Sequence, residues 1–339
     1  MTPRERVVRA LTFARPDRAP RDLWALPGVG MRRAAELERM KARHPSDFGG
    51  PGLGYGRGLA ASGDAYRLGG YTDEWGCTFE VYEEGVVGEI KRPPLADWSA
   101  LDRLRPPREL LDVDWSVADR ARDGNDRFIL AGTSIRPFER MQFLRGTENL
   151  FMDLASGDAR ALRLRSMVHE FYLEELSHWV ERDVDGISFM DDWGTQNALL
   201  VSPAMWREIY KPLYREYAAM IRGAGKHVFF HSDGNIAEII PDLVEIGVTA
   251  LNSQLFCMDI ENIGRRFRGR ITFWGEIDRQ HVLPLGSEAE VRDAVRRVRR
   301  ALDHGRGGVI AQCEWGIGAP KANIEAVFDE WMKPRPATE

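Results

Sequence analysis

Short apolar runs alternate with longer amphipathic stretches along most of the chain. Residues 127–132, 186–190 and 228–230 are rich in branched and aromatic side chains and end at glycine or polar residues, which is typical of buried strands. Between such runs the apolar residues recur at helical spacing, for example over residues 158–181. Further strands are predicted to end near Trp24, near Asn252, at Trp274 and at Cys313.

This order of elements predicts a parallel sheet, because helices join successive strands. At least five βα units are predicted in the later half of the chain, after earlier strands near Trp24 and Phe128. No convincing G-x-G-x-x-G motif follows a strand, which disfavours an open dinucleotide-binding sheet. We therefore expect an α/β fold, a (β/α)8 TIM barrel formed as one domain by residues 1–339.

Two stretches depart from the alternation of strands and helices. Residues 71–90 alternate apolar and polar side chains around Gly85, which predicts a β-hairpin inserted near the barrel mouth. Residues 49–58 are rich in glycine. Because no buried strand is predicted before them, we interpret them as a loop rather than as a phosphate-binding turn.

Helix starts are marked by capping residues at several points. Thr2 with Glu5, and Ser287 with Glu290, have the spacing of a capping box. After the strand at 228–230, Asn235 is expected to cap a helix that begins directly at residue 236.

Composition narrows the classes of partner. The chain has 47 Lys and Arg against 52 Asp and Glu, a net charge of −5, and no long basic block, so nucleic acid is not the expected partner. No stretch approaches the roughly 18 consecutive apolar residues of a membrane span. The N-terminus is charged and lacks an apolar signal region, and the three cysteines are odd in number and far apart. These features predict a cytoplasmic protein without disulfides.

Polar side chains gather where the predicted strands end. In a barrel these ends converge on one mouth. Converging carboxylates raise one another's pKa unless a cation or a proton lies between them, so the mouth should hold a metal ion, a cationic substrate group or a shared proton. The residues concerned are Asp191, Asp192, His231, Asp233, Asn252, Glu276, Asp278, Cys313 and Glu314.

Individual roles follow from residue type, and several stay open. His231 and Cys313 together are a zinc-type ligand pair, although a buried Cys313 could equally be a small apolar filler. Asp192 is expected to be a partly buried functional carboxylate, since an apolar strand precedes it. Trp24 and Trp193 are interpreted either as core residues or as walls of an aromatic pocket.

Several motifs, in this order, resemble the uroporphyrinogen decarboxylase superfamily. They are Thr2-Pro3-Arg4-Glu5-Arg6-Val7, Pro16-Asp17-Arg18-Ala19-Pro20, Tyr71-Thr72-Asp73-Glu74-Trp75-Gly76, His231-Ser232-Asp233-Gly234, Ile240-Pro241-Asp242-Leu243 and Phe273-Trp274-Gly275-Glu276-Ile277-Asp278. The resemblance extends over nearly the whole chain and implies one (β/α)8 barrel, often dimeric. The superfamily includes decarboxylases that need no cofactor and zinc-dependent methyltransferases that work with corrinoid proteins or thiols.

The departures from the family pattern favour the methyltransferase branch. The decarboxylases carry an arginine-bearing segment after the first strand, where this chain has residues 24–30 without arginine. The methyltransferases carry His-x-Cys and a distant Cys as zinc ligands. His231 matches the histidine, Asp233 stands in the position of the first cysteine, and Cys313 fits the second.

The resemblance therefore implies a methyltransferase with Zn²⁺ at His231, Asp233 and Cys313. The substrate would be a small methylated molecule or a methylcorrinoid from a partner protein, and a homodimer is expected. The alternative is a metal-free decarboxylase that uses Asp192 and His231, and a third class is a non-catalytic binding protein on a barrel scaffold. The site residues expected are Asp192, Glu276 and His231 for catalysis, and Trp24, Trp193, Asn252 and Glu314 for substrate binding.

Overall fold

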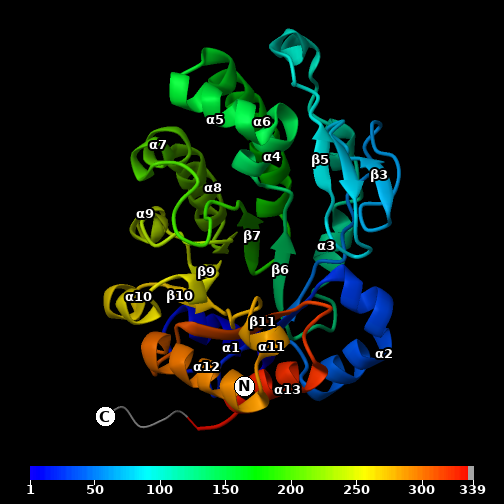
Figure 1. Ribbon diagram of the computed structural model, residues 1–339. Coiled ribbons are helices and arrows are strands. Elements are labelled where there is room, and N and C mark those ends of the chain that lie inside the picture. The colour runs from blue at the N-terminus through cyan, green and yellow to red at the C-terminus, as the bar shows by residue number, and fades with distance from the viewer. Residues whose placement is uncertain (335–339) are drawn as a thin grey trace.

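The computed structural model describes residues 1–334, and a barrel of parallel strands is its centre (Figure 1). Within those residues an eight-stranded sheet has the order β1-β11-β10-β9-β8-β7-β6-β2. All of its paired strands are parallel, as expected for a (β/α)8 barrel. The strands are β1 (Arg21–Ala25), β2 (Phe48–Gly49), β6 (Phe128–Gly132), β7 (Gly186–Met190), β8 (His227–Ser232), β9 (Ala250–Ser253), β10 (Thr272–Trp274) and β11 (Val309–Trp315).

Helices surround the sheet and supply the connections between strands. Both predicted capping boxes are present, one at Thr2 with Glu5 and one at Ser287 with Glu290. The α-helices are α1 (Pro3–Leu11), α2 (Pro27–Arg43), α3 (Ser116–Arg120), α4 (Pro137–Arg145), α5 (Thr147–Ser156), α6 (Ala159–Val180), α7 (Pro203–Ile209), α8 (Lys211–Gly223), α9 (Ile240–Ile246), α10 (Ile260–Phe267), α11 (Val282–Leu285), α12 (Glu288–Leu302) and α13 (Lys321–Trp331), with short 3-10 turns η1 (Trp98–Arg103), η2 (Arg108–Leu111) and η3 (Leu255–Cys257).

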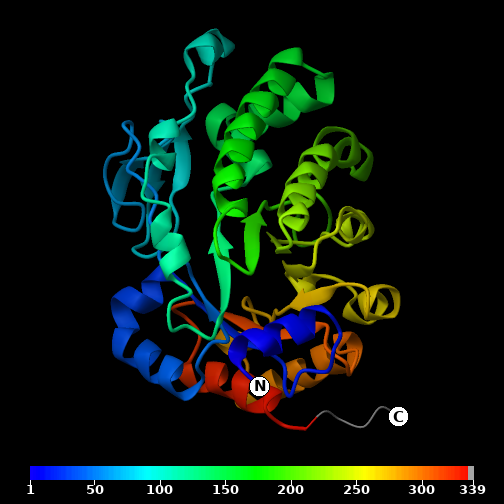
Figure 2. The ribbon, with the colours of Figure 1, turned by 180° about the vertical axis from the view of Figure 1, so that it is seen from behind.

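Side chains along each strand alternate between the inside of the barrel and the surrounding helix layer. The inner cluster contains Phe48, Phe128, Phe229, Trp274 and Ile310, and it also includes apolar residues of α1. Helix α1 therefore covers the end of the barrel away from the strand ends that carry the polar residues, and Figure 2 shows it lying across the lower part of the molecule. The alternate strand residues pack outward in the main core cluster.

A buried carboxylate closes the barrel between β1 and β2, the two ends of the strand order, a junction called the seam below. The backbone N–H of Asp47 donates to Arg21 O at 2.9 Å, and its carbonyl accepts from Phe128 N at 3.0 Å. Its side chain, 1% exposed, accepts hydrogen bonds from Arg6 Nη1 at 2.6 Å and from Arg18 Nη1 at 2.7 Å. Asp47 thus joins strands that share no regular ladder.

The inserted element has three antiparallel strands, so the predicted hairpin is incomplete. They are β3 (Gly69–Thr72), β4 (Thr78–Val81) and β5 (Glu89–Arg92), paired in the order β3-β4-β5. Arg140 of α4 holds this sheet through Asp73 at 2.5 Å. Gly85, at φ +83°, lies against Gly28 so closely that a Cβ on Gly85 would lie 2.4 Å from the Gly28 Cα. The turn between β4 and β5 therefore packs directly on α2.

Two sequence expectations are wrong in detail. Strand β2 overlaps the start of the glycine-rich stretch at Gly49, where no strand was expected, because two residues are too short to produce a recognisable apolar run. The helix after β8 begins at Ile240 and not at residue 236. Asn235 Oδ1 instead accepts from Ala237 N at 3.2 Å and stabilises a turn.

Among the helices of residues 1–334, none is both long and apolar enough to cross a membrane.

The seam predicts a strong effect of substitution at Asp47. Asp47→Ala should lower the free energy of unfolding by about 3–5 kcal/mol, because buried Arg6 keeps only the more exposed Asp17 and Arg18 loses its paired carboxylate. Urea denaturation measures the change. The control is Glu38→Ala, which removes a pair with Lys41 in which both side chains are exposed and should cost under about 1 kcal/mol. Equal losses for the two variants would show that Asp47 is not a special closure point.

Candidate functional site

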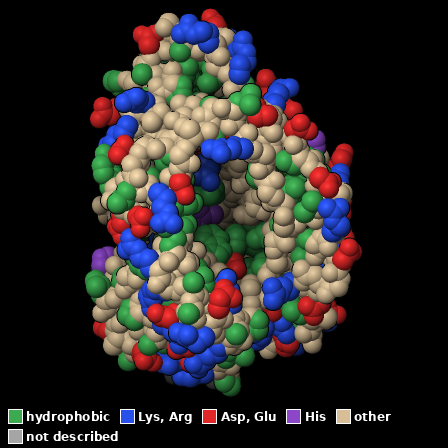
Figure 3. Space-filling view, turned by 90° about the vertical axis from the view of Figure 1, so that its right-hand side faces the viewer, with side chains coloured by type: hydrophobic (Ala, Val, Ile, Leu, Met, Phe, Trp, Pro, Cys, Tyr) green, Lys and Arg blue, Asp and Glu red, His purple; other side chains and the backbone are tan. Residues whose placement is uncertain are grey.

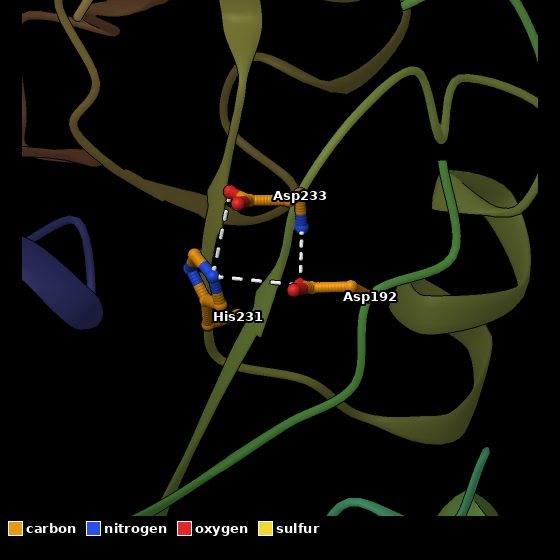
Figure 4. Close-up of side chains that lie close together, drawn as sticks. All are labelled: Asp192, His231 and Asp233. Carbon is orange, nitrogen blue, oxygen red and sulfur yellow. Dashed lines mark hydrogen bonds and ion pairs between the residues drawn. The ribbon is translucent and has the colours of Figure 1, made fainter. Parts of the chain in front are cut away.

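Two neighbouring strands bring an aspartate, a histidine and a second aspartate together at the barrel mouth. Asp192 follows β7, His231 lies near the end of β8, and Asp233 follows β8. One ligand atom from each lies within 4.8 Å of the others. His231 Nε2 is 3.6 Å from Asp192 Oδ1 and 3.5 Å from Asp233 Oδ1, and Figure 4 shows both carboxylates directed toward the imidazole.

The orientation of the imidazole is set from behind by Asn252 on β9. His231 Nδ1 is 2.6 Å from Asn252 Oδ1. The amide orientation is fixed in turn, because Asn252 Nδ2 donates to Trp274 O at 2.5 Å and to Gln312 Oε1 at 3.3 Å. An amide oxygen can only accept, so Nδ1 carries the proton. In the neutral imidazole Nε2 therefore presents a lone pair to the two carboxylates.

Two tryptophans and a buried carboxyl support this histidine from inside the barrel. The Trp24 ring lies 5.4 Å from the His231 ring and meets Trp274 edge-on at 4.9 Å. Both indole N–H groups donate to Asp22 Oδ2 at 2.9 Å. Burial raises the pKa of Asp22 to about 6, although these hydrogen bonds oppose the shift. Trp24 therefore lies between the inner apolar cluster and His231.

Arg279 is the main residue that the sequence reasoning missed. It lies in the loop after β10, and its guanidinium pairs with Asp233 Oδ2, with Glu314 Oε1 at 2.7 Å and with Glu276 Oε1 at 3.5 Å. A cation among converging carboxylates was expected, but the chain itself supplies one. The only sequence signal is an arginine three residues after Glu276.

Glu276 and Glu314 both lie at the mouth beside this arginine. Glu276 is 5% exposed, and burial raises its pKa well above the ordinary value, with Arg279 opposing the shift. Burial likewise raises the pKa of Asp192, while His231 lowers it. Glu276 and Arg279 also line a cavity of about 70 Å³, together with Gln196, Gln254, Phe256, Cys257, Asp278, Gln280 and His281.

Other expected site residues lie in the helix layer. Cys313 alternates with Glu314 on β11, is fully buried in the outer core, and is not part of the Asp192, His231 and Asp233 cluster. Trp193 is also fully buried, stacks on Phe138 with ring centroids 4.0 Å apart, and donates from Nε1 to a tyrosine hydroxyl. Neither side chain faces the mouth.

Asp191, the neighbour of Asp192, has a structural environment. Its carboxylate accepts from Phe138 N at 2.7 Å and from Glu139 N at 2.8 Å, and so caps the first turn of α4. The Tyr214 hydroxyl donates to it at 2.5 Å. Adjacent aspartates therefore point to opposite sides of the strand end, one to the helix layer and one to the mouth.

Solvent reaches deep into one face of the molecule. Figure 3 shows the face that carries the inserted sheet and α2, and it is hollowed near its centre. Lys or Arg side chains stand at the edge of the hollow, and a histidine and hydrophobic side chains lie within it. Acidic side chains also lie at the hollow, and a concave surface that combines apolar with a few polar groups is typical of a small-molecule site.

A family model agrees with this geometry. Residues 71–333, well over half of the chain, match the family described as "Uroporphyrinogen decarboxylase (URO-D)". The chain belongs to the uroporphyrinogen decarboxylase family. The family is named for an enzyme, and the polar barrel mouth is where such a fold places its chemistry. No curated protein matches the sequence.

Three solved structures are similar to this chain at low sequence identity. A "methyltransferase from Methanosarcina mazei" superimposes with a TM-score of 0.70 at 16% identity, covering 98% of each chain. A xylanase from Gloeophyllum trabeum has a TM-score of 0.41 at 10% identity, covering 64% of this chain and 79% of its own. A D-psicose 3-epimerase has a TM-score of 0.39 at 14% identity, covering 68% and 83%. The first comparison establishes a common fold over the full length.

The buried carboxyl predicts a pH-dependent stability. The pKa of Asp22 is higher in the folded chain than its ordinary value of 3.8, so its contribution is complete below about pH 4 and is lost as pH rises through 6. The loss is at most about 3 kcal/mol. Asp22→Asn should therefore gain stability relative to wild type between pH 4 and 7 in thermal unfolding. Parallel curves for the two proteins would contradict the assignment.

Proposed function

We propose that this protein is a metal-assisted methyltransferase whose metal ligands are Asp192, His231 and Asp233. The observation that carries the proposal is the convergence of His231 Nε2 and two carboxylate oxygens within 4.8 Å of one another, while Asn252 Oδ1 holds His231 Nδ1 from behind. One nitrogen donor and two oxygen donors at this spacing are a ligand set for a divalent cation.

The spacing of the donor atoms fits such an ion. Zinc binds imidazole nitrogen and carboxylate oxygen at about 2.0–2.2 Å, so two ligands at a tetrahedral angle lie roughly 3.4 Å apart. The separations from His231 Nε2 to the two aspartate oxygens are 3.5 and 3.6 Å. Three protein ligands leave a fourth position for substrate, as in catalytic zinc sites. Zn²⁺ is therefore the cofactor proposed, held without Cys313.

Two arginines near the mouth are already engaged by other groups of the chain, which favours this function over the decarboxylase alternative. A porphyrinogen carries many carboxylates and needs free cations to hold them. Arg279 is already paired with three carboxylates. Arg33, near the first strand, is bound to Ala319 O at 2.7 Å and to Glu36. A small methylated substrate makes no such demand for positive charge.

Each residue of the mouth has a role in this proposal. The bound metal supplies Lewis acidity that polarises a methyl donor or activates an acceptor. Asn252 holds the tautomer of His231, and Trp24 packs on its ring and limits its rotation. Glu276 borders the cavity and is the carboxyl placed to exchange a proton with a substrate bound there. Glu314 keeps Arg279 in position.

The partners proposed follow the family resemblance. The methyl group would move between a small methylated molecule, or a methylcorrinoid carried by a partner protein, and an acceptor. We also propose that the protein forms a homodimer. Gel filtration with light scattering measures its molar mass in solution.

Metal analysis of purified variants tests the ligand set. After zinc-supplemented expression, wild type should carry one zinc per chain, and His231→Ala should lose it, because imidazole is the one nitrogen ligand. Asp192→Asn and Asp233→Asn should each weaken binding at least 10-fold. Cys313→Ser is the matched control and should retain zinc. Retention by His231→Ala, or loss by Cys313→Ser with the fold intact, would refute this ligand set.

Asn252 provides a second test that leaves the ligands in place. Asn252→Leu keeps a similar volume but removes the acceptor of the His231 Nδ1 proton, so zinc affinity should fall about 10- to 100-fold. Competition with a chromophoric chelator measures this affinity. An unchanged affinity would mean that the hydrogen bond does not orient the ligand. If wild type binds no zinc at all, the metal-free decarboxylase reading with Asp192 and His231 replaces the proposal.

A further inference from the structure

Arg279 joins carboxylates from three different strand ends. Its Nη2 pairs with Asp233 after β8, its Nη1 with Glu314 on β11 at 2.7 Å, and its Nε approaches Glu276 after β10 at 3.5 Å. Its side chain is only 20% exposed. A guanidinium so enclosed by oxygen atoms has the surroundings of a bound cation rather than of a surface ion pair.

Asp233 is both a partner of this guanidinium and one of the proposed metal ligands. Its Oδ1 lies 3.5 Å from His231 Nε2, while its Oδ2 pairs with Arg279. The two oxygens of one carboxylate therefore face two different positive positions. In two-metal sites ions about 3.5–4 Å apart lie close enough for a carboxylate to bridge them. Asp233 occupies the place of such a bridge.

The groups around Arg279 are carboxylate oxygens, which Zn²⁺ accepts among its protein ligands. Glu276 is 5% exposed, so its carboxylate cannot rely on bulk water for stabilisation. The cavity of about 70 Å³ beside Glu276 and Arg279 also has polar walls, including Gln254 and Asp278. It has room for water molecules that would complete the coordination of an ion.

We infer that Arg279 is a built-in second cation: it fills the position that a second metal ion would take, with Asp233 as the shared carboxylate. The inference rests on the proposed function for the first position, but it concerns a separate position. Arg279 limits the mouth to one exchangeable ion. It also leaves Asp233 only one oxygen for that ion, so Arg279 is a positioning residue that acts through Asp233.

The number of zinc ions bound with and without Arg279 tests this inference. Isothermal titration with zinc chloride, checked by elemental analysis after desalting, should give one ion for wild type and two for Arg279→Ala. Arg279→Lys keeps the positive charge and should bind one. The thermal midpoint of Arg279→Ala should be low without zinc and should recover when zinc is added, because the ion replaces the lost cation.

A purely structural role for Arg279 makes a different prediction. If Arg279 only ties the loop after β10 to its neighbours, Arg279→Ala should bind as many ions as wild type and zinc should not restore its stability. That result would overturn the inference. Arg207→Ala removes an arginine from Asp242 outside the mouth and should leave the stoichiometry unchanged. Arg279→Gln is measured in parallel and decides the outcome if the alanine variant does not fold.

The two proposals fail in different ways. Binding of no zinc by wild type refutes the proposed function, whatever the variants do. The inference depends on the difference between Arg279→Ala and wild type, which should be one ion per chain. Equal stoichiometry in folded protein refutes the inference even if wild type binds zinc as proposed.

Discussion

The alternation of side chains along closed parallel strands decides which residues can act together. On β8 it directs His231 inward, and on β9 and β11 it gives Asn252 and Glu314 the same direction. The same alternation puts Cys313 among the helices, one residue away from the mouth. A shift of one residue in any register would exchange these sets, so the site depends on the barrel register more than on any single contact.

Placing several carboxylates at one mouth has an electrostatic cost that the chain offsets locally. Arg279 neutralises part of the charge through three ion pairs, and Asn252 uses its amide to fix the one imidazole. The carboxylate of Asp191 adds no uncompensated charge to the mouth, because it accepts hydrogen bonds from the first turn of α4 and from the Tyr214 hydroxyl. His231 Nε2 lies 3.5 and 3.6 Å from two carboxylate oxygens, and this convergence is where we propose that a cation binds.

Much of the barrel could be predicted from the sequence because its strands are apolar runs that end at polar residues. Strand β2 was not predicted, because two residues show no recognisable pattern. Closure of the barrel between β1 and β2 depends on Asp47, whose partners Arg6 and Arg18 are distant in sequence. The convergence of Asp192, His231 and Asp233 followed from strand ends alone. The position of Arg279 could not be predicted in this way. Arg279 lies in a loop and is positioned by side chains that are distant in sequence, such as Glu314.

Asp233 and Arg279 form an ion pair at the mouth, beside His231. A thiolate in the position of Asp233 would offer a single donor atom. A carboxylate has two oxygens, and here one faces His231 while the other meets Arg279. In this chain the carboxylate of Asp233 and the guanidinium of Arg279 form one electrostatic unit beside His231.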